Sequence, residues 1–256
     1  MGKLDVDEDV AQILLDEGGA KATRNGNLNR KFVRKIMDRM AGYDKGIKDR
    51  LDYKEVWNEE EVPSLADLRY VLLFGKLIRK HKGAFHVTKL GQKLLEEDNA
   101  GKLYAHLFRT FFITFDLIVL DGVGECPGLQ ETIAYSFSVI KKSAGDWVLL
   151  DDILPVLFLP GIARNIPVSN YSGTSYAPIV AETRVLRPLK RFGLVETRRE
   201  KRDDPTDWQT NMFFRKTSLF DTFIEIRLDA DHTCSETSEI HADEKQRFDD
   251  YQRLRE

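Results

Sequence analysis

The sequence predicts a mainly α-helical protein with small β hairpins, built as tandem winged-helix-like domains joined by a long helix. Two observations predict this class. The segments Leu68 to Gly75 and Leu186 to Gly193 share Leu, Arg, Phe and Gly at a constant separation of 118 residues. After each segment come short apolar runs of the kind that form hairpins, and then a threonine, Thr88 or Thr217. This recurrence indicates a repeated supersecondary unit.

In the first half, apolar residues on one face predict a helix over Arg30 to Met40, and a second helix is expected over Ser64 to Phe74. Gly75 is expected to end that helix, because a left-handed C′ residue costs glycine no steric clash. Lys82 and Gly83 are expected to form the turn of a short hairpin. Gly101 to Leu120 is expected to form the long connecting helix.

In the second half, the helix that ends at Gly193 carries a buried stripe of Leu186, Leu189 and Phe192. The insertion Arg198 to Trp208 is polar and contains a proline, which is typical of a long hairpin loop, the wing. The other expected elements are helices at Leu129–Lys142 and Asp151–Phe158, strands at Trp147–Leu150, Leu194–Val195 and Asn211–Arg215, and a closing helix after Thr217.

Three threonines, Thr23, Thr88 and Thr217, each precede an amphipathic run. A threonine hydroxyl at this position accepts a hydrogen bond from the first turn of a helix. We therefore expect each of the three to be the N-cap of the helix that follows it.

Length and composition predict two domains in a chain that buries a core. The 256 residues are 42% hydrophobic and 32% charged, which excludes a disordered or collagen-like chain, and no run is apolar enough to span a membrane. The predicted boundaries are residues 1–100 for the first domain, 101–126 for the connecting helix and linker, 127–228 for the second domain and 229–256 for an acidic tail. Two cysteines, Cys126 and Cys234, and an N-terminus without an apolar signal region predict a cytoplasmic protein.

Charge is distributed unevenly along the chain. The formal net charge is −3, but the segment from Leu228 to Glu256 holds nine acidic and four basic residues, so the other 227 residues carry about +2. A further hypothesis is that this acidic tail competes with DNA for the basic face. The uneven distribution favours a binding protein over an enzyme.

The first half contains the segments Thr23-Arg-Asn-Gly-Asn-Leu28, Val62-Pro63 through Arg69, Phe74-Gly75 and Thr88-Lys-Leu-Gly91. With these segments, about residues 20–115 resemble the C-terminal region of bacterial proteins related to open reading frame three of the Ri plasmid. The sequence departs from that family at Lys76, where leucine is expected, and over its second half. The resemblance implies a bacterial, mobile-element setting and no catalytic residues.

The candidate site is a basic stripe in the second half. From Glu182 to Arg202 there are eight basic and three acidic residues. Phosphates on duplex DNA bind cations arranged along one face, and arginine can bond guanine edges. We therefore expect these residues to form one nucleic-acid-binding surface: Arg184, Arg187, Lys190 and Arg191 on the helix, and Arg198, Arg199, Lys201 and Arg202 on the wing.

Other interpretations of this stripe stay open. It can be a solvated helix face balanced by carboxylates of the wing, and Pro188 either kinks the helix or marks its start. In the first half, Lys80, His81, Lys82 and Lys89 either contact a nucleic-acid backbone from the short hairpin or form an ordinary solvated turn, and the sequence favours the turn. The polar loop Pro167–Pro178 suits either ligand or phosphate contact through hydroxyls and backbone amides or an ordinary interhelical turn, and we expect the turn.

No enzyme signature is found. The five histidines form no metal-binding spacing, and no phosphate-binding glycine motif is present, so no catalytic residue, metal or cofactor is expected. The predicted function is DNA binding by the second winged helix, in a regulatory or mobile-element role. The alternative is a protein-interaction scaffold that binds protein partners without DNA. The sequence does not determine the oligomeric state, and a homodimer is among the alternatives.

Overall fold

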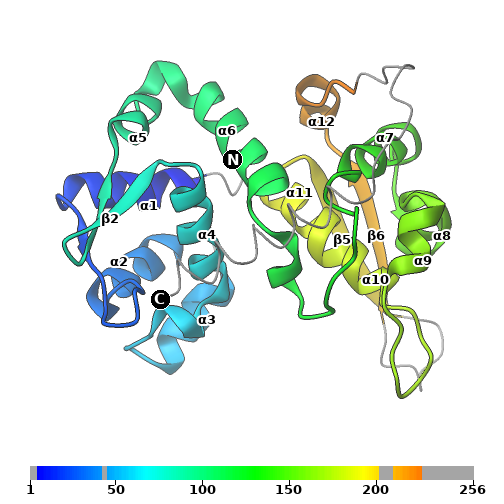
Figure 1. The fold of residues 1–256 in the computed structure, drawn as a ribbon, viewed down its shortest axis with the longest axis horizontal. Helices are drawn as coiled ribbons and strands as arrows, with labels where there is room; N and C mark the ends of the chain where they lie inside the picture. Colours follow the sequence, from blue (N-terminus) through cyan, green and yellow to red (C-terminus); the bar gives the residue numbers. More distant parts are fainter. Residues whose placement is uncertain (1–4, 42–44, 202–209, 227–256) are drawn as a thin grey trace. The chain divides into compact units, whose positions relative to one another are not determined.

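The structure is a computed structural model that describes residues 5–41, 45–201 and 210–226. Most of these residues are helical, and the strands form two small antiparallel sheets, as the sequence predicts (Figure 1). The chain divides into two compact units between Asp116 and Leu117, within the predicted connecting segment 101–126. Arg202 and the acidic segment 229–256 lie outside the described residues. Within those residues, no helix has the length and apolar character needed to cross a membrane.

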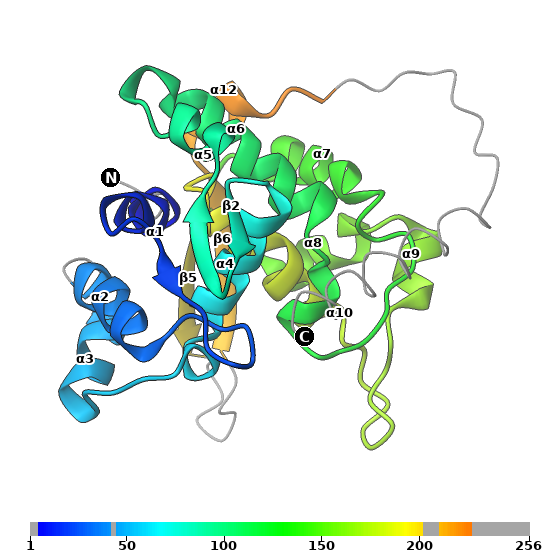
Figure 2. The same ribbon diagram turned by 60° about the vertical axis from the view of Figure 1, so that its left-hand side comes forward.

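The first unit places its three-stranded sheet among helices, with strand order β1-β3-β2 (Figure 2). Its elements in chain order are α1 (Asp5–Asp16), β1 (Ala20–Lys21), α2 (Arg30–Met40), α3 (Lys45–Tyr53), the 3-10 helix η1 (Glu59–Glu61), α4 (Pro63–Phe74), β2 (Ile78–His81), β3 (Ala84–Val87), α5 (Lys89–Leu94), the 3-10 helix η2 (Glu97–Asn99), α6 (Ala100–Arg109) and the π-helix η3 (Thr110–Thr114).

The second unit repeats this arrangement, with strand order β4-β6-β5. Its elements are the 3-10 helix η4 (Leu117–Leu120), α7 (Ile133–Ser143), β4 (Val148–Leu149), α8 (Leu150–Leu157), α9 (Pro160–Asn165), α10 (Ala177–Val180), the π-helix η5 (Ala181–Leu186), α11 (Arg187–Arg191), β5 (Val195–Lys201), β6 (Thr210–Lys216) and α12 (Ser218–Phe223).

The strand registers show that the two units correspond residue by residue around their hairpins. Ile78 pairs with Val87 in the first unit, and Val195 pairs with Lys216 in the second. The first members of these pairs are 117 residues apart, not the 118 that the sequence comparison predicts. Phe85 and Phe214 occupy equivalent positions on the middle strands, and both are fully buried.

The separation of 117 residues aligns Gly193 with Lys76 and not with Gly75, which changes the role of Gly75. Gly193 has φ +68° and is the left-handed residue that ends its helix, as predicted, but Gly75 has φ −69°. In the first unit Lys76 takes the left-handed conformation, with φ +56°. Gly75 is needed for space, because a Cβ there would lie 3.1 Å from the Val71 carbonyl oxygen and 3.2 Å from His106 Nε2.

The expected helix over Gly101–Leu120 is interrupted. After α6 the chain forms one π-helical segment and then leaves the helix at Phe115, whose backbone is extended. Phe115 is fully buried, with its ring centre 5.3 Å from that of Phe111 and 6.4 Å from that of Phe74. Packing Phe115 into this aromatic cluster breaks the helix that its apolar sequence predicts.

The three threonines behave differently from one another. Thr88 is the N-cap of α5, and its hydroxyl accepts a hydrogen bond from Gly91 N at 3.0 Å, as predicted. Thr217 is at the N-cap of α12 but makes no side-chain capping hydrogen bond; its hydroxyl donates to the Gly193 carbonyl at 2.8 Å, just as the Thr88 hydroxyl donates to the Lys76 carbonyl at 2.7 Å. Thr23 is not a helix cap: it accepts from Asn27 N inside a turn, and Asn29 caps α2.

Candidate nucleic-acid interface

Arg184, predicted to contact DNA, is buried in the second unit. Its Nε and Nη2 each donate to a different carboxylate oxygen of Asp121 at 2.8 Å, and Nη2 also donates to the Gly124 carbonyl. The exposed fractions of the two side chains are 3% and 2%. The prediction is therefore wrong for Arg184, which ties the loop at Asp121 to the helix.

The environment of Asp121 favours its charged form. Burial alone raises the pKa of this carboxyl, but hydrogen bonds from Arg184, from the Thr183 hydroxyl and from Val123 N more than offset that effect. The pKa of Asp121 is consequently lower than usual. The ion pair is a structural element of the second unit.

The π-helix η5 explains why Arg184 turns inward. A π-helix closes its hydrogen bonds between residues five apart instead of four, which shifts the faces of the helix. Glu182 and Arg187, five residues apart, both reach the surface, whereas Thr183 and Arg184 are buried. Pro188, which has no N–H to donate, follows directly in the first turn of α11.

Arginines from the helix and from the wing do meet on the surface. Arg187 of α11 and Arg199 of β5 both donate through Nη2 to Oε1 of Glu182, and both are about half exposed. Beside them, Lys190 Nζ donates to the Thr197 hydroxyl at 2.7 Å. One carboxylate thus lies between two guanidinium groups, with a third cation next to it.

Arg198 belongs to the opposite face of the same hairpin, because side chains alternate along a strand. Its guanidinium lies 4.5 Å from the centre of the Trp147 ring and forms an ion pair with Glu200 at 3.0 Å. Arg215 lies 4.7 Å from the same ring and pairs with Glu196. This face is a ladder of arginine, tryptophan and glutamate.

The eight predicted residues therefore do not form one surface. Arg187, Lys190 and Arg199 come together, Arg198 lies on the other face, and Arg184 is buried. Arg191 is half-buried, and Lys201 is exposed at the end of β5. Spacing alone gave no sign of the π-helix that divides them.

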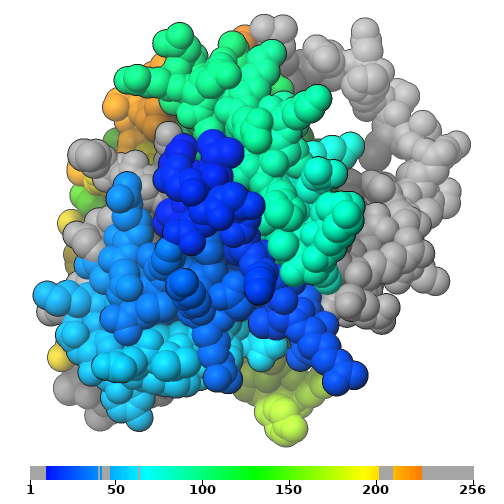
Figure 3. Space-filling view, turned by 90° about the vertical axis from the view of Figure 1, so that its left-hand side faces the viewer, coloured from blue at the N-terminus to red at the C-terminus, as the bar shows by residue number. Residues whose placement is uncertain are grey.

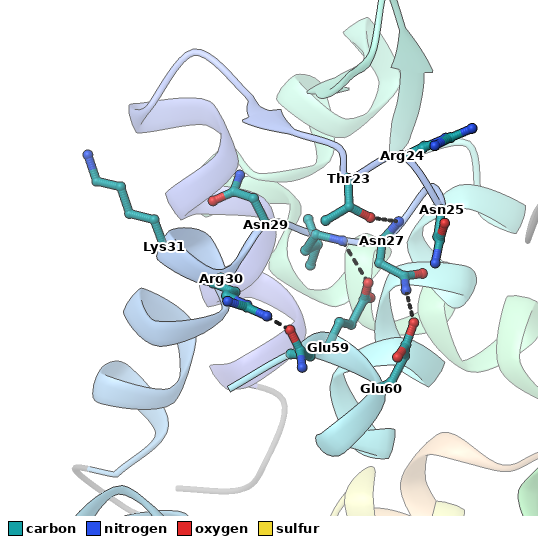
Figure 4. A pocket seen from close by; sticks show the side chains of 11 residues that line it. Thr23, Arg24, Asn25, Asn27, Asn29, Arg30, Lys31, Glu59 and Glu60 are labelled. Carbon is teal, nitrogen blue, oxygen red and sulfur yellow. Dashed lines mark hydrogen bonds between the residues drawn. The ribbon is translucent and has the colours of Figure 1, made fainter. Parts of the chain in front are cut away.

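A pocket of about 640 Å³, lined mostly by residues with polar or charged side chains, lies in the first unit beside the start of α2. Asn27 Nδ2 donates to Glu60, and Leu28 N donates to Glu59, across its floor (Figure 4). Arg24 and Lys31 extend away from the pocket on opposite sides.

Behind this pocket lies a second buried ion pair. Arg69 Nε donates to Glu59 Oε1 at 2.6 Å, and both side chains are 2% exposed or less. Burial raises the pKa of Glu59, while Arg69 and Leu28 N act in the opposite direction. Glu59 and Arg69 thus hold the loop at Asn27 to η1 and α4.

The hairpin of the first unit, β2 and β3 with their turn, is called the first wing. Its cations, Arg79, Lys80 and Lys82, are exposed and differ from those of the second hairpin, since no described carboxylate forms an ion pair with them. The sequence contains a signal for this: residues 68–95 include seven Lys or Arg and no Asp or Glu. Among the described residues, no group of three or more His, Cys, Asp or Glu side chains is placed so that it could hold a metal ion.

Comparison with known proteins covers the first unit. Residues 7–100 match the family model of the Y4jL N-terminal domain. Neither the curated proteins nor the solved structures contain a significant match to the chain. The resemblance to Ri-plasmid proteins stays a prediction, and the first unit is similar to the Y4jL N-terminal domain.

Proposed function

We propose that the protein binds duplex DNA, and that the second unit contacts it through Arg187, Lys190 and Arg199. The observation that carries this proposal is the meeting of Arg187 from α11 and Arg199 from β5 at Glu182. A cytoplasmic location, a bacterial setting and a regulatory or mobile-element role belong to the same proposal.

The chemistry of this surface suits phosphate groups. Each of the two arginines has further N–H donors beyond the one given to Glu182, and both side chains are about half exposed. Binding of phosphates by such cations releases condensed counterions, which gives affinity that falls with salt. The shared carboxylate lowers this affinity and fixes the two guanidinium groups in position.

A protein-interaction scaffold is the second candidate function, and a specific feature favours it. Residues 166–181 contain no charged side chain, and the loop between α9 and α10 stands out from the helices around it (Figure 2). Tyr171 in this loop is fully exposed, and Val168 is 56% exposed. Exposed aromatic and aliphatic side chains on such a loop fit a protein partner better than a polyanion.

Anisotropy of a labelled DNA duplex, titrated at several salt concentrations, tests the DNA-binding proposal. We expect the double variant Arg187→Ala/Arg199→Ala to reduce the slope of log K against log salt by about two, because two phosphate contacts are lost. Glu182→Gln should strengthen binding, because it frees both guanidinium groups. Lys142→Ala/Arg164→Ala removes the same charge from exposed positions of the same unit and is the matched control.

Equal slopes for the Arg187/Arg199 variant and its control would overturn this proposal. Unchanged binding by Glu182→Gln would also count against it, since the structure places that carboxylate between the two cations.

A further inference from the structure

We propose that the first wing, β2 and β3 with their turn, is a separate phosphate-binding surface for nucleic acid, through Arg79, Lys80 and Lys82 together with Lys21 and Arg24. The proposal goes beyond the proposed function, because it concerns the other unit and does not require the second unit to touch DNA.

The first observation is the absence of neutralising groups. The side chains of Arg79, Lys80 and Lys82 are all exposed, and none forms an ion pair or a hydrogen bond with a described residue. The whole stretch of residues 68–95 lacks Asp and Glu. These cations are therefore available to an external anion.

The second observation is the contrast with the equivalent hairpin. In the second unit, Glu196 and Glu200 lie on β5 and pair with Arg215 and Arg198. Two of the wing arginines are also stacked on Trp147. The two hairpins share their register, so the difference in charge lies in the side chains and not in the fold.

The third observation is that further cations lie beside this wing. Lys21 on β1 pairs with Ala84 on β3, and Ala22 N donates to the Gly83 carbonyl at the tip of the wing. The loop that carries exposed Arg24 continues from there. In Figure 3 this blue segment and the teal wing border one another on the face shown.

The turn of the first wing has a defined hairpin geometry. Lys82 has φ +49° and Gly83 has φ +72°, the pair of positive angles that a two-residue type I′ hairpin requires. Neighbouring residues of a strand point to opposite faces, so Arg79 and Lys80 place cations on both faces of the ribbon. β2 is an edge strand of the three-stranded sheet, so phosphate groups of nucleic acid can reach its exposed cations from the open side of that sheet.

The chemistry indicates contact with the backbone and little reading of base sequence. Lysine is a point charge that binds phosphate without directional preference, and phosphate contacts position a protein without specifying sequence. We therefore expect this surface to bind different duplexes about equally.

The test uses the full chain with the triple variant Arg79→Gln/Lys80→Gln/Lys82→Asn. Asparagine is chosen at position 82 because it tolerates a positive φ. The control, Lys48→Gln/Lys102→Gln/Arg109→Gln, removes the same charge from exposed positions of α3 and α6. Thermal unfolding of each variant establishes that the fold is intact.

We expect the triple variant to reduce the slope of log K against log salt for a DNA duplex by about three, with the same loss on two unrelated sequences. The control should retain the slope of the unmodified protein. A triple variant that matches its control would overturn the proposal. So would a loss confined to binding of vesicles containing anionic lipid, since the surface would then serve a membrane.

The two proposals fail separately in this assay. If only Arg187→Ala/Arg199→Ala reduces the slope of log K against log salt, DNA binding by the second unit is supported and the inference about the first wing is overturned. If only the triple variant reduces that slope, the inference about the first wing is supported and DNA binding by the second unit is overturned.

Discussion

At the scale of single residues, the least expected finding is that Arg184, predicted to contact DNA, is buried in an ion pair that stabilises the second unit. Its guanidinium and the carboxylate of Asp121 are both buried and share two hydrogen bonds. Removing one member of a buried ion pair leaves an uncompensated charge, which costs about 3–5 kcal/mol.

Asp121→Asn should therefore lower the free energy of unfolding by about 3 kcal/mol at neutral pH. The pKa of Asp121 is lower in the folded state than in the unfolded chain, so its stabilising effect is present above the unfolded value of about 3.9. The effect is lost as the pH falls through the folded pKa. Urea unfolding at pH 7 and below pH 4 measures the free energy of unfolding of both proteins and so the contribution of Asp121 at each pH.

The difference in stability between Asp121→Asn and the unmodified protein should shrink at the lower pH. A difference that is the same at both values would show that the charge of Asp121 does not stabilise the unit.

At the scale of elements, the sequence predicted well those segments whose local pattern and tertiary packing agree. The helix over Arg30–Met40 has the bounds that its apolar face predicts, and the hairpin turn falls at Lys82 and Gly83. The π-helix η5 and the break at Phe115 were not predictable from periodicity. In both, a buried group determines the backbone: Arg184 reaching Asp121, and Phe115 packing with Phe111.

The candidate site shows the same limit. The sequence identified the cations of the second wing but could not show that Glu182 neutralises part of their charge. In the first wing, the lack of acidic residues around Lys80 can be read from the sequence, whereas the exposure of its cations required the structure.

The helix ends that precede the two wings provide a matched pair of predictions. Lys76 has a left-handed backbone that disfavours a residue with a Cβ, so Lys76→Gly should raise the free energy of unfolding by up to about 1 kcal/mol. Gly193→Lys places the same residue at the equivalent left-handed position and should lower it by about 1 kcal/mol.

Chemical denaturation of the two variants tests this correspondence, with Gly101→Ala as a control in an open helical position that should become more stable. If Lys76→Gly destabilises the protein as much as Gly193→Lys, the two positions are not equivalent.

At the scale of the whole molecule, one topology occurs twice with different surfaces. The first hairpin carries cations without acidic neighbours, and the second carries cations held by glutamates and a tryptophan. The formal net charge of −3 does not reveal either surface, because the segment from Leu228 onward contributes −5. Local charge, and not net charge, supports a polyanionic partner.

The most direct measurement of the central claim is the affinity of the full chain for a short DNA duplex between about 50 and 200 mM salt. Binding through the cations of the two wings predicts that log K falls linearly with log salt, with a slope of several units. A slope near zero, or no binding at low salt, would contradict the claim and favour the scaffold, in which the exposed loop at Tyr171 binds protein.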